Sequence, residues 1–232
     1  MIARFADLGT VPPEYGAAAD AVVFDEVSER RSPSTLHIYS RDRTTISLGR
    51  FRDLDTDVRK DVLEHLGLSV IRRISGGSTI LTGTSQIIYS LTSEDIFLNK
   101  KDSYVKICGC IVSALNSLGL NAEYKEPNDV LVRGMKISGG AQYRAIGCLI
   151  QHGTVIVEPE PLIDEVLVST KDRKYLRTTS ISECLGHSIL RENIVNALRT
   201  AFENNLSLEF TNSMLTDREL KLISQRSESF KV

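Results

Sequence analysis

Apolar residues recur with two different spacings along the chain, and helical spacing takes over toward the C-terminus. Short apolar or alternating runs, which are typical of strands, lie at 34–39, 44–48, 69–74, 78–81, 86–91, 129–132, 135–138 and 148–157. Helical spacing occurs at 15–28, 57–66 and 101–118 among these strands, and at 160–167, 191–204 and 217–227 after them. This order predicts an α+β fold, with a mixed, largely antiparallel β-sheet flanked by helices, rather than a regular βαβ repeat.

Two of the strand-like runs are close neighbours in the sequence. Only the residues 82–85 separate 78–81 from 86–91, and this spacing predicts an antiparallel hairpin. The chain contains no internal repeat and no low-complexity linker, and its 232 residues fit one large domain. The sequence therefore predicts a single domain over residues 1–232.

Composition argues against several classes of function. The net charge of −2, the pI of about 6.1 and the absence of Trp do not suit a nucleic-acid surface. No run approaches the roughly 20 apolar residues of a membrane span, and the N-terminus lacks the basic and apolar regions of a signal peptide. We therefore expect a cytoplasmic protein, with neither nucleic acid nor membrane as a partner. Its four cysteines are expected to be reduced and mostly buried.

A glycine pair follows two arginines at the end of a predicted strand, in the run RRISGGSTI of residues 72–80. Gly76 and Gly77 permit a close backbone approach to a ligand, and the small residues after them can direct N–H groups at an anion. An arginine beside such a loop meets phosphate or carboxylate oxygens in a forked geometry. A simple hairpin bend has the same pattern, so the residues alone leave both interpretations open.

A second glycine pair, Gly139-Gly140, follows Lys136. Because side chains alternate along a strand, Met135 and Ile137 point to the face opposite Lys136. A lysine on that face can project into a pocket and hold a carbonyl oxygen and a phosphate together. The alternative is a surface lysine on an edge strand.

His152 lies in the predicted strand 148–157. No second His or Cys stands at the spacing of a metal site, so a metal role is not predicted for it. We expect instead a packed or hydrogen-bonded structural role.

Taken in order, these motifs resemble those of the lipoate–protein ligase A family, in the superfamily of biotin and lipoate ligases and octanoyltransferases. The matching segments are Arg72 to Ser78 for an RRxSGGG loop, Asn128-Asp129 with Gly134 to Gln142 for an ND…GxKISGSAQ segment, His152 to Thr154 for an HGT strand, Ala19 to Ala21 in the first helix, and Ser34 to Tyr39 and Ser47 to Phe51 for two further strands. The resemblance covers about residues 15–230.

The resemblance implies a class II biotin/lipoate ligase-like catalytic domain and the activity of a lipoate–protein ligase. In such an enzyme, ATP with Mg²⁺ activates lipoate to lipoyl-adenylate, and the acyl group then passes to a lysine of a lipoyl carrier domain. The implied partners are the acyltransferase subunits of 2-oxoacid dehydrogenases and the glycine-cleavage H protein.

The same resemblance implies a role for each matched residue. Arg73 and the backbone of Ser78, Thr79, Ile80 and Leu81 would line the nucleotide, Gly76 and Gly77 would admit the adenylate, Asn128 and Asp129 would serve phosphate or Mg²⁺, and Lys136 would be the catalytic lysine that grips the acyl carbonyl and phosphate. Developing negative charge in such a reaction needs fixed cations and N–H donors, which is consistent with this set.

Three departures from the family pattern affect these expectations. Ser78 replaces the third glycine, and Thr82-Gly83 replaces the His-Asp pair that closes the loop in the family. The chain also ends at Val232 without the accessory domain of long bacterial ligases. Either a separate small accessory subunit assists activation, or the enzyme does not need that domain.

Other readings remain open beside the ligase. An octanoyl or lipoyl transferase would need no ATP and would use a cysteine thioester; Cys184 is the candidate because no cysteine directly precedes Lys136. A non-catalytic acyl-binding homologue would explain Thr82-Gly83, although the retained Lys136 argues against it. A biotin ligase would carry a GRGRxGR loop, which the residues 75–78 do not match.

Overall fold

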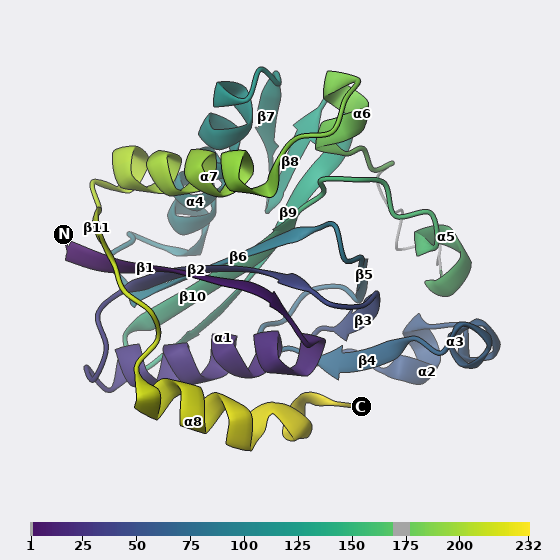
Figure 1. Cartoon of the computed structure of the whole chain (residues 1–232), viewed down its shortest axis with the longest axis horizontal. Coiled ribbons are helices and arrows are strands. Elements are labelled where there is room, and N and C mark those ends of the chain that lie inside the picture. Colours follow the sequence, from purple (N-terminus) through teal and green to yellow (C-terminus); the bar gives the residue numbers. More distant parts are fainter. Residues whose placement is uncertain (1, 169–176) are drawn as a thin grey trace.

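The computed structural model describes residues 2–168 and 177–232, and within them the strands form two sheets (Figure 1). The large sheet has the order β11-β1-β2-β6-β10-β9-β8-β7 and the small one the order β4-β3-β5. The strands are β1 (Ile2–Val11), β2 (Thr35–Arg41), β3 (Thr45–Leu48), β4 (Ser69–Arg72), β5 (Ile80–Thr82), β6 (Ile87–Glu94), β7 (Ala122–Lys125), β8 (Asp129–Val132), β9 (Met135–Ala145), β10 (Cys148–Val155) and β11 (Glu209–Asn212).

Helices cover both faces of the large sheet, as Figure 1 shows. They are α1 (Pro13–Ser28), α2 (Leu54–Asp57), α3 (Lys60–Leu66), α4 (Lys100–Ser117), α5 (Ile163–Val166), α6 (Ile181–Leu185), α7 (Arg191–Leu206), α8 (Asp217–Arg226) and a 3-10 turn (Ser227–Phe230). Helices α4 and α7 pack on one face around a core that includes Ile107, Ile111 and Phe202. Helix α1 packs on the other face and is covered in turn by α8. Pro13 in the first turn of α1 suits the start of a helix, and the alanines of α1 allow close packing on both sides.

The predicted fold class is confirmed. Most neighbouring strands are antiparallel, while β1 runs parallel to β2 and β11, and β3 parallel to β4, so the sheets are mixed. No helix in the described part of the chain combines the length and hydropathy that a membrane crossing requires.

Two local predictions were wrong. The runs 78–81 and 86–91 do not form a hairpin, because β5 pairs with β3 in the small sheet and β6 lies between β2 and β10 in the large one. The predicted helix 57–66 is divided at Val58, which is extended and bridges to Leu167. In both places a long-range strand contact replaced the local structure that periodicity favours. The N-terminal strand β1 was not predicted at all.

One buried ion pair fastens the C-terminal helix to the large sheet. Arg4 of β1 donates to both oxygens of Glu219 in α8 at 2.6 and 2.7 Å, and both side chains are buried. Glu219 also accepts from the backbone N–H of Thr216, the N-cap residue of α8. Burial raises the pKa of Glu219, but the bonds from Arg4 and Thr216 outweigh it and lower the pKa from 4.5 to about 2. The ionised carboxylate is therefore the form that the fold stabilises.

We predict that Glu219→Gln lowers the free energy of unfolding by about 3 kcal/mol at pH 7, because Arg4 is left as a buried charge without its partner. Because the folded pKa lies below the unfolded one, the contribution is present above pH 4.5 and is lost as the pH falls toward 2. Urea unfolding at pH 7 and pH 3 measures this contribution. The difference in the free energy of unfolding between the variant and the wild type should be smaller at pH 3. Glu228→Gln, at a carboxylate that is 77% exposed, is the control and should change little. An equal gap at both pH values would contradict the assignment.

Candidate functional site

A cavity of about 870 Å³ lies between the large sheet, the small sheet and α1. Of the residues predicted to form a site, those that line it are Arg73, Gly77, Ser78, Ile80, Leu81, Asn128, Asp129 and Lys136. Residues from β2, β6, β9 and β10 form its floor, and the small sheet with the glycine loop forms the opposite wall. The fold thus brings together two motifs that are about 60 residues apart in the sequence.

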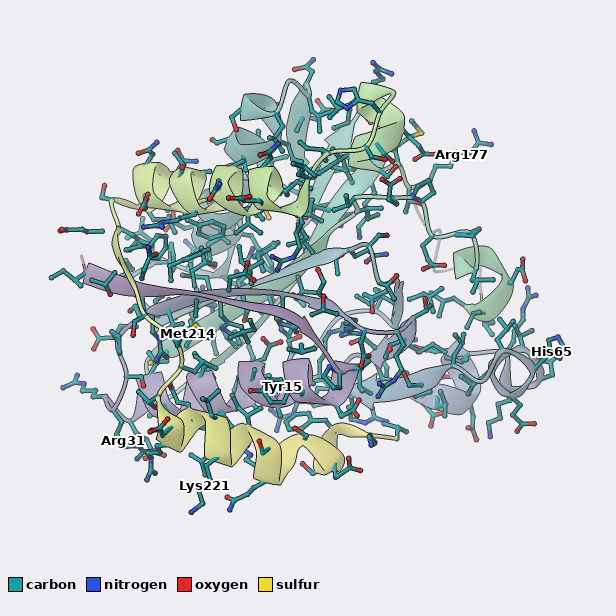
Figure 2. The ribbon with its side chains drawn as sticks, in the orientation of Figure 1. Tyr15, Arg31, His65, Arg177, Met214 and Lys221 are labelled. Carbon is teal, nitrogen blue, oxygen red and sulfur yellow. The ribbon has the colours of Figure 1, made fainter. Side chains whose placement is uncertain are left out.

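Lys136 reaches this cavity from β9 in a fixed position. Its Nζ lies 2.6 Å from Asp129 Oδ1, and the lysine side chain is 30% exposed. Gly139 makes the arrangement possible, because a Cβ there would lie 2.5 Å from Nζ of Lys136. The backbone of Lys136 pairs with Arg177 and Thr179, and Figure 2 shows Arg177 on the segment between α5 and α6. An ammonium group beside a carboxylate therefore faces the cavity.

Asn128 forms hydrogen bonds with the backbone of the second glycine pair. Its side-chain amide donates to the carbonyl of Gly140, and the Gly140 N–H donates to the Asn128 carbonyl at 2.9 Å. These bonds hold Gly140 against the start of β8, next to Asp129. Asn128 thus fixes the backbone around the lysine and also lines the cavity.

Arg73 holds the first glycine loop in shape. Its guanidinium donates to Ser75 Oγ at 3.1 Å and to the carbonyls of Ser47, Gly76 and Ser78 at 2.8, 2.9 and 2.6 Å. Gly77 has φ +94°, a backbone conformation that favours glycine. Burial and then the nearby charge of Arg41 lower the pKa of Arg73 to about 10. Most of its N–H groups are therefore used within the loop.

Two predicted site residues do not line the cavity. Thr79 is fully buried, and its hydroxyl donates to Asp57 at the end of α2. Gly76 has open space where a Cβ would stand and lacks a positive φ. Their proposed roles toward a nucleotide stay predictions.

Sequence reasoning missed a buried hydrogen-bond chain behind the loop. Asp20 of α1 accepts from His152 Nδ1 at 2.6 Å and contacts His37 Nε2 at 2.9 Å. A carboxylate only accepts, so in neutral His152 the other ring nitrogen is left to accept from Ser75 Oγ, 2.5 Å away. Burial raises the pKa of Asp20, but the contacts with His152 and His37 lower it more, well below its usual range. His152 thus has the hydrogen-bonded role expected of it, and an acid within an alanine-rich helix was the available signal.

Other cavity residues carried no signal in the sequence. Arg41 ends β2 and donates to Thr82 Oγ1, the residue that stands in place of the family's histidine. Lys125, Gln86, Glu160 and Arg177 also line the cavity. They come from separate elements, so only the tertiary structure brings them together.

The described residues include no group of three or more His, Cys, Asp or Glu side chains arranged to hold a metal ion. Asp129, the predicted Mg²⁺ ligand, is paired with Lys136. Its metal role stays a prediction.

The cysteines lie outside the described lining of the cavity. Cys108, Cys110 and Cys148 are buried, and burial raises the pKa of the first two thiols to about 12. Cys184, on α6, is partly exposed, and its Sγ lies 3.4 Å from Thr179 Oγ1. It is therefore the most accessible thiol, yet it packs against the main core.

Comparison with known proteins places this geometry in a family. Residues 12–203 match the family described as the lipoyl protein ligase A/B catalytic domain. The octanoyltransferase LipM of Oceanobacillus iheyensis is 28% identical, with 85% of this chain and 82% of that protein covered. The octanoyltransferase LipM of Brevibacillus brevis is 24% identical, with 96% and 93% covered.

Solved structures share the fold. A lipoate–protein ligase A bound with ATP matches with a TM-score of 0.87 and 19% identity, over 98% of this chain and 95% of that one. A bi-partite lipoate–protein ligase of Thermoplasma acidophilum, studied with its lipoyl domain, matches with a TM-score of 0.85 and 20% identity, over 98% and 92%. At these identities the likeness shows the fold alone.

The expectation of an ATP-dependent lipoate–protein ligase was wrong, because the similar curated relatives are octanoyltransferases. The physical reason is that ligation and transfer both place an acyl carbonyl beside a cation and N–H donors, so motifs around Lys136 do not specify how the acyl group is activated. The match over residues 12–203 nonetheless shows that the chain belongs to the lipoyl protein ligase A/B catalytic domain family, and that it is an enzyme of the lipoate ligase and octanoyltransferase group.

Proposed function

We propose that this enzyme is an acyltransferase that moves an octanoyl or lipoyl group from a thioester to a lysine of a lipoyl carrier domain. The observation that carries the proposal is Lys136, whose ammonium is held by Asp129 over Gly139 and faces the cavity. The relatives named octanoyltransferase support the acyl group and the type of reaction. The acceptors would be acyltransferase subunits of 2-oxoacid dehydrogenases or the glycine-cleavage H protein.

In this reaction the carrier lysine, as a neutral amine, attacks the thioester carbonyl. The carbonyl oxygen takes up negative charge, the C–S bond breaks, the thiol leaves, and an amide remains. Lys136 stabilises the developing oxyanion, because a cation fixed in advance needs no reorganisation during the reaction. ATP has no step in this route, and a separate accessory subunit for activation is not required.

The route we propose is direct, without an enzyme thioester. Among the residues that the structure describes, no cysteine lines the cavity. Cys184 packs against the core and contacts Thr179 rather than Lys136. Direct attack by the carrier amine therefore fits the described side chains better than a relay through a thiol. We also propose that residues 1–232 act as one domain, since α1 and both sheets contribute to the same cavity.

The test of the function is an assay with octanoyl thioester and an apo lipoyl domain, with and without ATP. We expect octanoylation of the carrier lysine at the same rate in both mixtures. Mass spectrometry of the lipoyl domain measures it. A matched reaction with free octanoate and ATP should give no product. Product formed only in the reaction with free octanoate and ATP would contradict the proposal. No product in any mixture would favour a non-catalytic acyl-binding protein.

We predict that Gly139→Ala lowers kcat by about tenfold or more while the melting temperature stays near the wild-type value. The added Cβ would displace the flexible end of Lys136 from Asp129, and losing one oxyanion donor costs roughly a hundredfold in comparable sites. Lys136→Ala should reach that larger loss. Gly109→Ala, in α4 with open space around its Cβ, is the control. Unchanged kcat in both Gly139→Ala and Lys136→Ala would remove Lys136 from the reaction.

We predict that Cys184→Ser retains most of the activity, because direct transfer needs no thiolate. The measurement is the transfer rate, together with intact-mass analysis of the enzyme after mixing with octanoyl thioester. Cys148→Ser, at a buried cysteine, serves as the control. An inactive Cys184→Ser and an octanoyl adduct on wild-type Cys184 would establish the covalent route instead.

A further inference from the structure

Three carboxylates line the described part of the cavity, and two of them are engaged by other side chains. Asp20 is hydrogen-bonded to two histidines, and Asp129 is paired with Lys136. The third is Glu160, which follows β10. Among the described residues, its carboxylate has one hydrogen bond, from the N–H of Leu162 to Oε1 at 3.4 Å, and no ion pair. Glu160 is therefore a carboxylate of the cavity whose charge no described side chain neutralises.

The position of this carboxylate depends on a glycine in the opposite wall. A Cβ at Gly83, directly after β5, would overlap with Oε2 of Glu160. Any side chain at this position would therefore displace the carboxylate. The family pattern has an aspartate where this chain has Gly83, so the Glu160 carboxylate occupies the space in which that side chain would begin. This chain thus has a carboxylate at the same place, but from another segment.

Glu160 enters the cavity beside the strands that position Lys136. The N–H of Ile156 donates to the carbonyl of Ile137 at 2.9 Å, so the end of β10 lies against the start of β9. Glu160 comes four residues after Ile156, and a segment of that length spans at most about 14 Å. The cation proposed for the acyl oxygen and the carboxylate without an ion pair therefore lie on the same side of the cavity.

The proposed acyl transfer needs a proton acceptor close to the acyl carbonyl. When the carrier amine attacks the thioester, the N–C bond forms and the nitrogen becomes positively charged. This nitrogen has to lose one proton before the amide is complete. A carboxylate within reach of it, directly or through one water, can accept that proton. Asp129 could do so only by giving up its pairing with Lys136.

We propose that Glu160 is the general base of the transfer and takes a proton from the attacking nitrogen of the carrier lysine. This proposal rests on the proposed acyl transfer. The N–C bond forms, one proton passes from the nitrogen to the Glu160 carboxylate, the C–S bond breaks, and the proton passes on to the departing sulfur. The products are the amide and the thiol, and the carboxylate is restored. Gly83 makes room for this carboxylate and is therefore a positioning residue.

The first test is Glu160→Gln in the full chain, assayed with octanoyl thioester and an apo lipoyl domain. We expect kcat/KM for the lipoyl domain to fall by about a hundredfold, as is common when a general base is removed, with a melting temperature near the wild-type value. Added formate, a small carboxylate, should restore part of the activity of Glu160→Gln and leave the wild type unchanged. Glu165→Gln, at an exposed glutamate of α5 outside the cavity lining, is the control.

The second test displaces the carboxylate without removing it. Gly83 lacks a positive φ, so an alanine is compatible with its backbone. We expect Gly83→Ala to lower kcat/KM by at least about tenfold, because the added Cβ moves Oε2 of Glu160 away from its place. Combined with Glu160→Gln, it should cause no further loss, since both changes remove the same interaction. Losses that multiply in the double variant would overturn the link between the two residues.

Two results for Glu160→Gln would overturn the proposal, namely activity near the wild-type value or a loss that formate does not relieve. If Glu160→Gln does not fold, Gly83→Ala decides, because it keeps the carboxylate in the chain. Unchanged kcat/KM in Gly83→Ala would then exclude a role for the carboxylate at this place.

Octanoyl-adenylate as a second donor separates this proposal from the proposed function. If the wild type uses the adenylate and not the thioester, the proposed donor is wrong. An equal loss in Glu160→Gln with the adenylate would still support Glu160 as the base, because the attacking amine is the same. Absence of transfer from either donor by the wild type would overturn both proposals.

Discussion

The carboxylate of Asp20 joins the parts of the molecule that enclose the cavity. It lies buried on α1 and is held by His37 of β2 and His152 of β10, and His152 in turn reaches Ser75 in the glycine loop. A buried carboxylate is costly unless it is paired and hydrogen-bonded, so these contacts have to form together. Helix, sheet and loop are thereby limited to one arrangement, and the cavity wall is set before any substrate arrives.

The charged side chains of the cavity occupy defined positions. Lys136 forms an ion pair with Asp129. Its ammonium fits beside Gly139 because this residue has no side chain. Arg41 and Arg73 are buried and line the same cavity.

The glycine loop has a structural task as well as a position at the cavity. Arg73 donates hydrogen bonds to carbonyls of the loop, and Gly77 has a φ that other residues rarely adopt. The chain matches the lipoyl protein ligase A/B family, its similar relatives are named octanoyltransferases, and a lipoate–protein ligase bound with ATP shares its fold. The fold and the family thus do not by themselves specify how the acyl group is activated.

The sequence by itself determined the fold class, the helices α1, α4 and α7, and the two motifs that meet at the cavity, because periodicity and glycine spacing are local properties. It did not determine that β5 and β6 belong to different sheets, nor that Val58 divides a helix, since those depend on pairing with distant strands. The motifs predicted Lys136, Asp129 and Gly77 in the lining, but not that Thr79 turns away. Arg41 became a site residue only in the tertiary structure, because nothing in its local sequence records which side chains surround a buried charge.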